Sequence, residues 1–252
     1  MPTNRIIPSL LLRGGRLVKG EVFAAHRDAG NPATTARAHN AQGADEIIAL
    51  DIDASREDRG PDLEAVTRIA AEAQIPLTIG GGITSPEIAR ACLSAGADKV
   101  CLTSTALDTP GLLTDVARLC GRQAVVLGVD VMTDDNGTRR IFDHRTRSVH
   151  SALSWRDWMT KGVELGAGEI RLMAVDREGR RTGFDLELHA EARAAINTPI
   201  ILEGGAGTLE DLTTAMAAGV DSLAIGTMLV FSDNNIVKLK RVLAGAGQPM
   251  RP

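Results

Sequence analysis

The sequence predicts an α/β protein with the (β/α)8 barrel, or TIM-barrel, architecture, built from parallel strands in two half-barrels of four units each. Its 252 residues match the size of such a barrel. Short apolar runs alternate with longer amphipathic, Ala-rich segments. The chain also repeats itself, because Asp62-Leu63-Glu64 recurs 123 positions later as Asp185-Leu186-Glu187. A repeat of half the chain indicates a duplicated architecture.

We therefore expect one barrel domain over residues 1–252, with half-barrels at about 1–122 and 123–245. A doubly wound open sheet is the alternative, and it leaves the repeat unexplained. The eight expected strands are almost entirely apolar, as is typical of parallel strands buried on both faces. They cover residues 5–12, 46–51, 76–79, 99–102, 124–130, 169–174, 199–202 and 222–224.

Helices are predicted between these strands, at 85–95, 110–120, 155–165 and 209–218 among others. Ser85 and Thr208 suit the N-cap position, where a side-chain oxygen accepts a hydrogen bond from a free backbone N–H. Gly96 and Gly219 suit the helix C-termini. The Asp- and Arg-rich segment 132–151 shows no helical or strand pattern, so we expect an extended βα loop there.

Composition excludes several classes of protein. Hydrophobic residues make up 44% of the chain, which supplies ample core, and the net charge of −4 argues against a nucleic-acid or membrane-surface partner. No apolar run approaches the roughly 18 residues of a membrane span, and no signal-peptide pattern is present, so we expect a cytoplasmic protein. Neither the three cysteines nor the five histidines show ligand spacing. The sequence thus predicts no disulfide, metal site or cofactor.

Two groups of glycines and hydroxyl residues follow predicted strands, where barrels place their active sites. The first group contains Gly81, Gly82, Thr103 and Ser104, and the second contains Gly204, Gly205, Gly226 and Thr227. Free backbone N–H groups at such turns bind anions. One group alone is equally well explained by tight turns. Two groups related by the repeat predict a substrate with a phosphate at both ends.

Asp130 ends an otherwise apolar strand at this catalytic face, so it is the candidate for general acid or base work. A loop-capping role is the alternative. Its partner in the repeat is Leu11, which cannot transfer a proton. The other acidic candidates at strand ends are Asp51, Asp53, Asp176 and Glu178.

Four charged residues lie at the opposite ends of the strands, at or beside strand starts: Arg5, Glu46, Lys99 and Glu169. Glu46 and Glu169 are partners in the repeat. We expect either an ion-pair ring at the bottom of the barrel or separate, solvated charges.

Eight segments match motifs of one known family. They are Arg-Ile-Ile-Pro at 5–8, Gly-Gly-Arg-Leu-Val-Lys-Gly at 14–20, Gly-Ala-Asp-Glu-Ile-Ile at 43–48, Gly-Gly-Gly-Ile at 80–83, Ala-Gly-Ala-Asp-Lys-Val at 95–100, Gly-Ala-Gly-Glu-Ile at 166–170, Asp-Arg-Glu-Gly at 176–179 and Gly-Gly-Ala-Gly-Thr-Leu-Glu at 204–210. Up to about residue 245, the chain resembles the cyclase subunit of imidazole glycerol phosphate synthase.

This resemblance implies a barrel that pairs with a glutaminase subunit as a heterodimer and passes ammonia to a bisphosphate substrate. It implies an ammonia gate formed by the four charges at the strand starts, and a partner contact at Asp98. Lys19 lies in the family's mobile first loop. The implied substrate and phosphate positions are Lys19, Asp51, Gly81, Gly82, Thr103, Ser104, Asp176, Gly179, Gly204, Gly205, Gly226 and Thr227.

The chain departs from the family pattern at the reaction site. The family uses two catalytic aspartates; Asp130 matches the second, and Leu11 stands in place of the first. Further departures are Thr103 for Asn, Met173 and Ala174 for hydroxyl residues, Glu203 for Ser, and His144-Arg145-Thr146 for His-Gly-Gly. The stretch 10–15 looks more like a divergent paralogue group whose subunits supply ammonia for acetamidino-sugar formation in surface-polysaccharide biosynthesis.

Three functional hypotheses follow. The first is an ammonia-dependent synthase subunit that acts on a non-standard phosphorylated acceptor, such as an acetamidino-sugar precursor or a specialised metabolite. The second is a genuine histidine-biosynthesis cyclase. The third is a non-catalytic partner that docks and activates a glutaminase.

Overall fold

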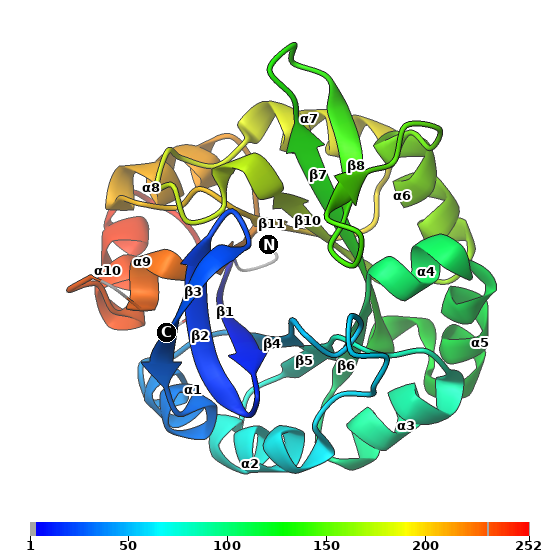
Figure 1. Ribbon diagram of the computed structural model, residues 1–252. Helices are drawn as coiled ribbons and strands as arrows, with labels where there is room; N and C mark the ends of the chain where they lie inside the picture. The colour runs from blue at the N-terminus through cyan, green and yellow to red at the C-terminus, as the bar shows by residue number, and fades with distance from the viewer. Residues whose placement is uncertain (1–3, 231, 252) are drawn as a thin grey trace.

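The computed structural model describes residues 4–230 and 232–251, and these form a closed barrel of eight parallel strands surrounded by helices (Figure 1). Around the barrel the strands are β1 (Arg5–Arg13), β4 (Ile47–Asp51), β5 (Leu77–Gly80), β6 (Lys99–Leu102), β7 (Val125–Thr133), β10 (Glu169–Ala174), β11 (Ile200–Glu203) and β12 (Ser222–Ile225). Pairing of β7 with β10 and of β12 with β1 closes the ring. The predicted (β/α)8 barrel is confirmed.

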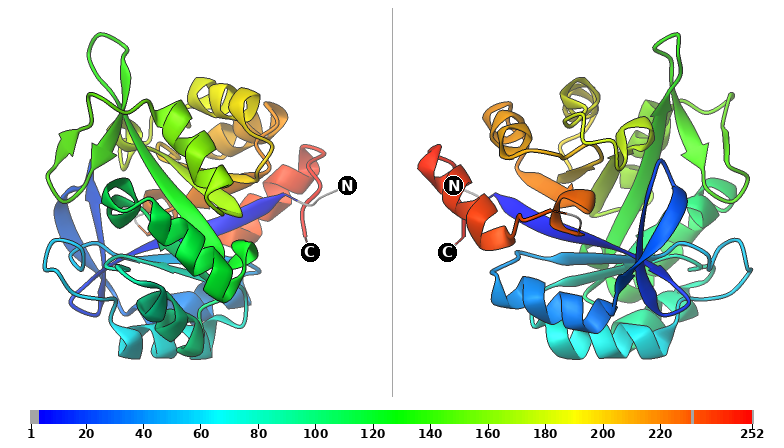
Figure 2. Two further views of the ribbon diagram at one scale, coloured as in Figure 1. Left: turned by 90° about the vertical axis from the view of Figure 1, so that its right-hand side faces the viewer. Right: turned by 60° about the vertical axis from the view of Figure 1, so that its left-hand side comes forward.

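Helices connect the strands and cover the outside of the barrel (Figures 1 and 2). They are α1 (Pro32–Ala41), α2 (Leu63–Ala73), α3 (Pro86–Ser94), α4 (Ser104–Asp108), α5 (Gly111–Cys120), α6 (Trp155–Glu164), α7 (Leu186–Ala195), α8 (Leu209–Ala217), α9 (Thr227–Val230) and α10 (Ile236–Gly245), with short 3-10 turns η1 (Arg122–Ala124) and η2 (Val175–Arg177). The four predicted helices are confirmed to within two residues at each end.

The predicted helix ends are confirmed at their caps. The side chains of Ser85 and Thr208 accept hydrogen bonds from the backbone N–H groups of Ile88 and Asp211. Gly96 and Gly219 directly follow the C-cap residues of α3 and α8, with φ of +109° and +88°. Such left-handed backbone conformations favour glycine after a helix.

Two hairpins extend the barrel on the side where the strands end (Figure 2). One consists of β2 (Arg16–Glu21) and β3 (Ala24–Gly30); the other joins β7 to β8 (Arg139–Asp143), which pairs with β9 (Ser148–Val149). The predicted extended βα loop at 132–151 is confirmed as the long connection from β7 to α6, but it is not irregular, because it contains β8 and β9. The Asp134 side chain accepts hydrogen bonds from two turn N–H groups, and Ile141 and Phe142 are buried. Flanking charges hide this short strand in the sequence.

The interior of the barrel is layered. Ile7, Ile48, Ile201 and Ala224 form a small, fully buried apolar cluster of their own, separate from the larger core between strands and helices. The charged strand starts lie below this cluster and the polar residues at the strand ends lie above it. Among the described residues, no helix combines the length and the apolar character that crossing a membrane requires.

Candidate active site at the barrel mouth

A cavity of about 440 Å³ opens among the carboxyl ends of β1, β4, β5, β6 and β7. Asp51, Gly81, Gly82, Thr103, Ser104 and Asp130 line it, together with Leu11, His26, His144, Arg13, Arg56, Arg145, Arg147 and Arg171. The sequence predicted the first six of these at the site. Their strands bring them together because the carboxyl ends of a parallel barrel meet at one face.

Asp130 lies at the floor of this cavity and is 1% exposed. Its Oδ1 accepts a hydrogen bond from Arg171 Nη1 at 3.2 Å, and its Oδ2 contacts His144 Nε2. Burial raises the pKa of Asp130, but the contacts with His144 and Arg171 outweigh burial and hold this pKa below its usual value. Asp130 is therefore an ionised carboxylate with both oxygens engaged.

His144 comes from the turn that follows β8, which the sequence analysis treated as loop. Its ring packs edge-on against Phe23 and Phe142, at centroid distances of 4.3 and 5.4 Å. The side chain is 31% exposed, so it reaches the cavity while touching Asp130. An ionised carboxylate can only accept, so Nε2 carries the proton in this hydrogen bond. His144 is thus the solvent-facing member of an Asp–His pair.

Arg171 is the residue that the sequence analysis missed. It lies on β10, one inward-facing position above Glu169, and is 2% exposed. Its Nε donates to Glu203 Oε2 at 2.5 Å, in addition to the bond with Asp130. Burial lowers the pKa of the guanidinium, but Glu203 and Asp130 outweigh burial and raise it. The available signal was a lone arginine in the otherwise apolar run 170–174.

Leu11 occupies the β1 side of the cavity, where it pairs in register with Leu50 of β4. It is 4% exposed. This position on the cavity wall is therefore apolar, and a leucine side chain cannot transfer a proton.

The first predicted anion region forms part of the cavity wall. Gly81 and Gly82 have φ of +99° and +68°, and a Cβ at either would lie about 2 Å from a backbone oxygen, so both turns require glycine. The N–H of Gly82 donates to Ser55 Oγ at 3.0 Å. Asp51 accepts from Arg59 Nη1 at 2.6 Å, which fixes the loop after β4.

The second predicted anion region is much smaller. Its cavity measures about 20 Å³ and is lined by Lys19, Glu178, Gly179, Glu203, Gly204, Gly205, Gly226 and Thr227, among others. Lys19 Nζ makes a buried ion pair with Glu178. Asp176 lines neither cavity; its Oδ1 accepts from the Thr133 N–H at 3.2 Å. Phosphate binding at either region stays a prediction.

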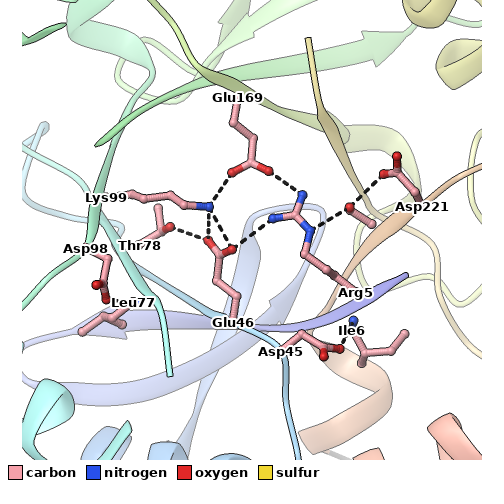
Figure 3. A network of polar contacts seen from close by, with 11 residues as sticks. Arg5, Ile6, Asp45, Glu46, Leu77, Thr78, Asp98, Lys99, Glu169 and Asp221 are labelled. Atoms are coloured by element: carbon pink, nitrogen blue, oxygen red, sulfur yellow. Dashed lines mark hydrogen bonds and ion pairs between the residues drawn. The ribbon is translucent and has the colours of Figure 1, made fainter. Parts of the chain in front are cut away.

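The four charges at the strand starts form a closed ring of ion pairs (Figure 3). Arg5 contacts Glu169 at 2.5 Å and Glu46 at 3.2 Å, and Lys99 contacts the same two carboxylates at 2.7 and 2.9 Å. The predicted ion-pair ring is confirmed as a structure; its gating role stays a prediction.

The ring is anchored by neighbouring polar side chains. Thr78 Oγ1 donates to Glu46 at 2.7 Å, and Arg5 Nε donates to Ser222 Oγ at 3.0 Å. Asp98, the predicted partner contact, is exposed beside the ring, and its carboxylate accepts from the Leu77 N–H at 2.9 Å (Figure 3). These contacts fix the ring at the start of the strands, opposite the mouth.

Comparison with known proteins assigns the family. Residues 5–235 match the model of the family described as histidine biosynthesis protein. The chain is 42% identical over 244 residues to the imidazole glycerol phosphate synthase subunit HisF of Alkaliphilus metalliredigens, covering 96% of each chain. The HisF subunit of Gluconacetobacter diazotrophicus is 41% identical, with 98% of this chain and 95% of the relative covered. The HisF subunit of Nocardioides sp. is 42% identical, with 98% of both covered. The chain therefore belongs to the family of HisF cyclase subunits of imidazole glycerol phosphate synthase.

Proposed function

We propose that this chain is a divergent, ammonia-using synthase subunit that pairs with a glutaminase in the cytoplasm. Ammonia released by the glutaminase enters at the ion-pair ring, crosses the barrel and adds to a phosphorylated acceptor at the mouth. The acceptor is a non-standard one, different from the substrate of the histidine pathway. The observation that carries this is the composition of the mouth: Leu11 lines the same cavity as Asp130, and Asp130 is already bound by Arg171 and His144.

The entry route is supported by the sequence of layers in the barrel. The ring lies at the strand starts, and the cluster of Ile7, Ile48, Ile201 and Ala224 lies above it. This apolar cluster admits neutral ammonia far more readily than ammonium, because burying an unpaired charge is costly, and the buried charges of Arg171, Asp130 and Glu203 are paired with one another. A glutaminase docked at this face, with Asp98 as one contact, would deliver ammonia directly to the ring.

The chemistry at the mouth requires proton transfer. In the proposed step, the ammonia lone pair forms a C–N bond to a carbonyl-type carbon of the acceptor, and the carbonyl oxygen leaves as water. As NH3 becomes the C=NH group, nitrogen loses two protons in succession, and each passes through His144 Nδ1 to the oxygen, which thereby leaves as H2O. Asp130 holds the His144 ring and its tautomer through Nε2, as carboxylates do for catalytic histidines. Asp130 thus acts with His144 rather than alone.

Complementation tests the choice of acceptor. The chain is expressed in a strain that lacks its histidine-pathway cyclase, with the HisF subunit of Alkaliphilus metalliredigens as the positive control. We expect the control to restore growth without histidine and this chain not to do so. Growth with this chain would refute the non-standard acceptor. A Leu11→Asp variant shows whether position 11 alone accounts for the difference.

The second candidate is the histidine-pathway cyclase itself. The identity of 42% to HisF subunits over nearly the full length favours it. It predicts growth in the same complementation experiment, and it predicts that Asp130→Asn abolishes that growth.

The third candidate is a non-catalytic activator of a glutaminase, which the complete ion-pair ring favours. It predicts that the chain raises glutaminase activity and that Asp130→Asn leaves every measurable function intact. The leading proposal differs, because it predicts that Asp130→Asn stops incorporation of ammonia into the acceptor while activation of the glutaminase persists.

A further inference from the structure

The barrel mouth contains two cavities of very different volume, one on each side; we call these sides the large half and the small half of the mouth, which are distinct from the half-barrels. The half bounded by Gly82, Ser104 and Asp130 contains a cavity of about 440 Å³. The half bounded by Gly204, Gly205 and Gly226 contains about 20 Å³. The smaller volume is close to the 10–15 Å³ or so that a single water needs, so with the side chains as they lie this cavity has room for about one water rather than for a phosphate group.

The small half is filled by the protein's own ion pair. Lys19 reaches in from the β2–β3 hairpin, and its ammonium contacts the Glu178 carboxylate, with both side chains at most 5% exposed. A Cβ at Gly226 would lie only 2.9 Å from Lys19 Nζ, so the ammonium covers that turn directly. The Val22 N–H also donates to the Glu178 carbonyl at 3.0 Å, which ties the hairpin down over this half.

The charges in the small half oppose a phosphate. Glu178 and Glu203 both line it. The cations that contact these two carboxylates are already used, because Lys19 is paired with Glu178 and Arg171 with Glu203 and Asp130. In addition, Glu178 Oε2 is buried without a hydrogen-bond partner among the described residues. A carboxylate oxygen needs a donor, which a hydroxyl or amino group provides and a phosphate dianion does not.

The large half has the opposite character. Arg13, Arg56, Arg145 and Arg147 line it. Arg13 and Arg56 share one carboxylate, that of Asp53, and Arg147 has no ion-pair partner in residues 4–230 and 232–251. Guanidinium groups bind phosphate oxygens in a two-point geometry. This half therefore retains cationic charge for one phosphate.

We propose that the acceptor carries a single phosphate, held in the large half of the mouth, and directs an uncharged hydroxyl- or amine-bearing end toward Glu178 and Glu203. This inference rests on the proposed function and names its substrate class. It replaces the sequence-based expectation of a phosphate at both ends, because one of the two glycine turns is covered by Lys19.

Titration of the isotope-labelled protein tests the proposal without any turnover. Inorganic phosphate is added while backbone amide resonances are followed by NMR. We expect saturable shifts at Gly82 and Thr105 and none at Gly205 or Gly226, with one phosphate bound per chain by calorimetry. Saturable shifts in both groups, or in neither, would overturn the inference.

A pair of sugar phosphates provides a second measurement. Fructose 6-phosphate and fructose 1,6-bisphosphate differ only in the second phosphate. We expect their dissociation constants to agree within about threefold, since the second phosphate gains no contact. If the bisphosphate bound roughly tenfold or more tightly than the monophosphate, the small half would have to accept a phosphate, which would contradict the inference.

Variants test whether the carboxylates of Glu178 and Glu203 are what prevents phosphate from binding in the small half. Glu178→Ala with Glu203→Ser removes charge and volume, and we expect a second phosphate to bind, with shifts appearing at Gly205 and Gly226. Glu210→Gln, an exposed glutamate on α8, is the matched control and should leave one site. A folded double variant that still binds one phosphate would overturn the inference; Glu178→Ala alone repeats the test if the double variant does not fold. Failure of ammonia chemistry would leave these binding results unchanged, so the two proposals fail separately.

Discussion

Arg171 lies inside the barrel with its guanidinium in contact with two carboxylates, Asp130 and Glu203. All three side chains are at most 5% exposed. Burying charged side chains costs desolvation free energy. The net contribution of the cluster to stability therefore depends on every charge having a partner. At the scale of single residues, this cluster determines both how stable the mouth is and which protonation state Asp130 holds.

We predict that Arg171→Met destabilises the protein by about 3–5 kcal/mol, because it leaves two buried carboxylates with too few partners. The measurement is the change in urea midpoint and in the free energy of unfolding. The control is Arg171→Met combined with Glu203→Leu, which removes one of those carboxylates and should recover about 1 kcal/mol or more. An effect of the single variant below about 1 kcal/mol would mean that Arg171 does not compensate these charges.

A second residue-scale prediction concerns pH. The pKa of Asp130 is lower in the folded state than its ordinary value of 3.8, because His144 and Arg171 outweigh burial. A lowered folded-state pKa contributes stability that is complete above the unfolded pKa and is lost as pH falls through the folded one. The free-energy difference between the wild type and Asp130→Asn should thus be constant from pH 7 to about pH 5 and shrink below about pH 4. A difference that grows on acidification would contradict this assignment.

At the scale of elements, the β2–β3 hairpin is held over the mouth by contacts with Glu178 and with the rings of Phe142 and His144. Lys19 supplies the buried ion pair with Glu178, and the Val22 N–H supplies a backbone bond to the same residue. Most of the outer strand β3 is exposed. The Lys19 ion pair is therefore the buried charged contact of the hairpin, and Phe23 adds an aromatic contact at its turn.

We predict that Lys19→Met loosens this hairpin without unfolding the barrel. Removal of the ammonium leaves Glu178 buried without its cation, so the contact with η2 weakens. Hydrogen exchange of the Val22 amide should accelerate at least about tenfold, which corresponds to a loss of roughly 1.4 kcal/mol in the opening equilibrium. Arg16→Met is the control, because its ion pair with Asp28 is exposed and exposed pairs contribute little. Equal exchange in both variants would show that the fastening lies elsewhere.

The elements also show what sequence reasoning can and cannot predict. Apolar runs located all eight barrel strands, because a strand buried on both faces has a local apolar pattern. Charges at strand starts located the ring, because the starts of parallel barrel strands meet at one face. The ion pairs of Lys19 with Glu178 and of Arg171 with Asp130 join residues 159 and 41 positions apart. No local pattern encodes such pairs. Strand β8 was missed because only Ile141 and Phe142 interrupt its run of charges.

At the scale of the whole molecule, a cut at the boundary predicted from the repeat, after residue 122, would separate the barrel into two open sheets. Strands β1, β4, β5 and β6 fall in residues 1–122, and β7, β10, β11 and β12 fall in the remainder. Each sheet alone has two edge strands without a partner. In the barrel, each of these edge strands pairs with one edge strand of the other sheet. The joins are β6 with β7, over Val100–Leu102 and Val125–Leu127, and β1 with β12, over Arg5–Pro8 and Ser222–Ile225.

We predict that residues 1–122 and 123–252, expressed as two separate chains, assemble into a one-to-one complex. Unpaired sheet edges seek a partner strand, and three links would add to the two joins: Arg5 with Glu169, Lys99 with Glu169, and Lys19 with Glu178. Size-exclusion chromatography measures the assembly, and the NMR amide signal of Val22 reports whether the hairpin has docked. The control divides the chain inside α2, after Val66, which cuts that helix and leaves two barrel strands in one piece and six in the other; it should assemble poorly. If the first pair stays separate, or if the control assembles equally well, the half-barrels are not the units from which this barrel is built.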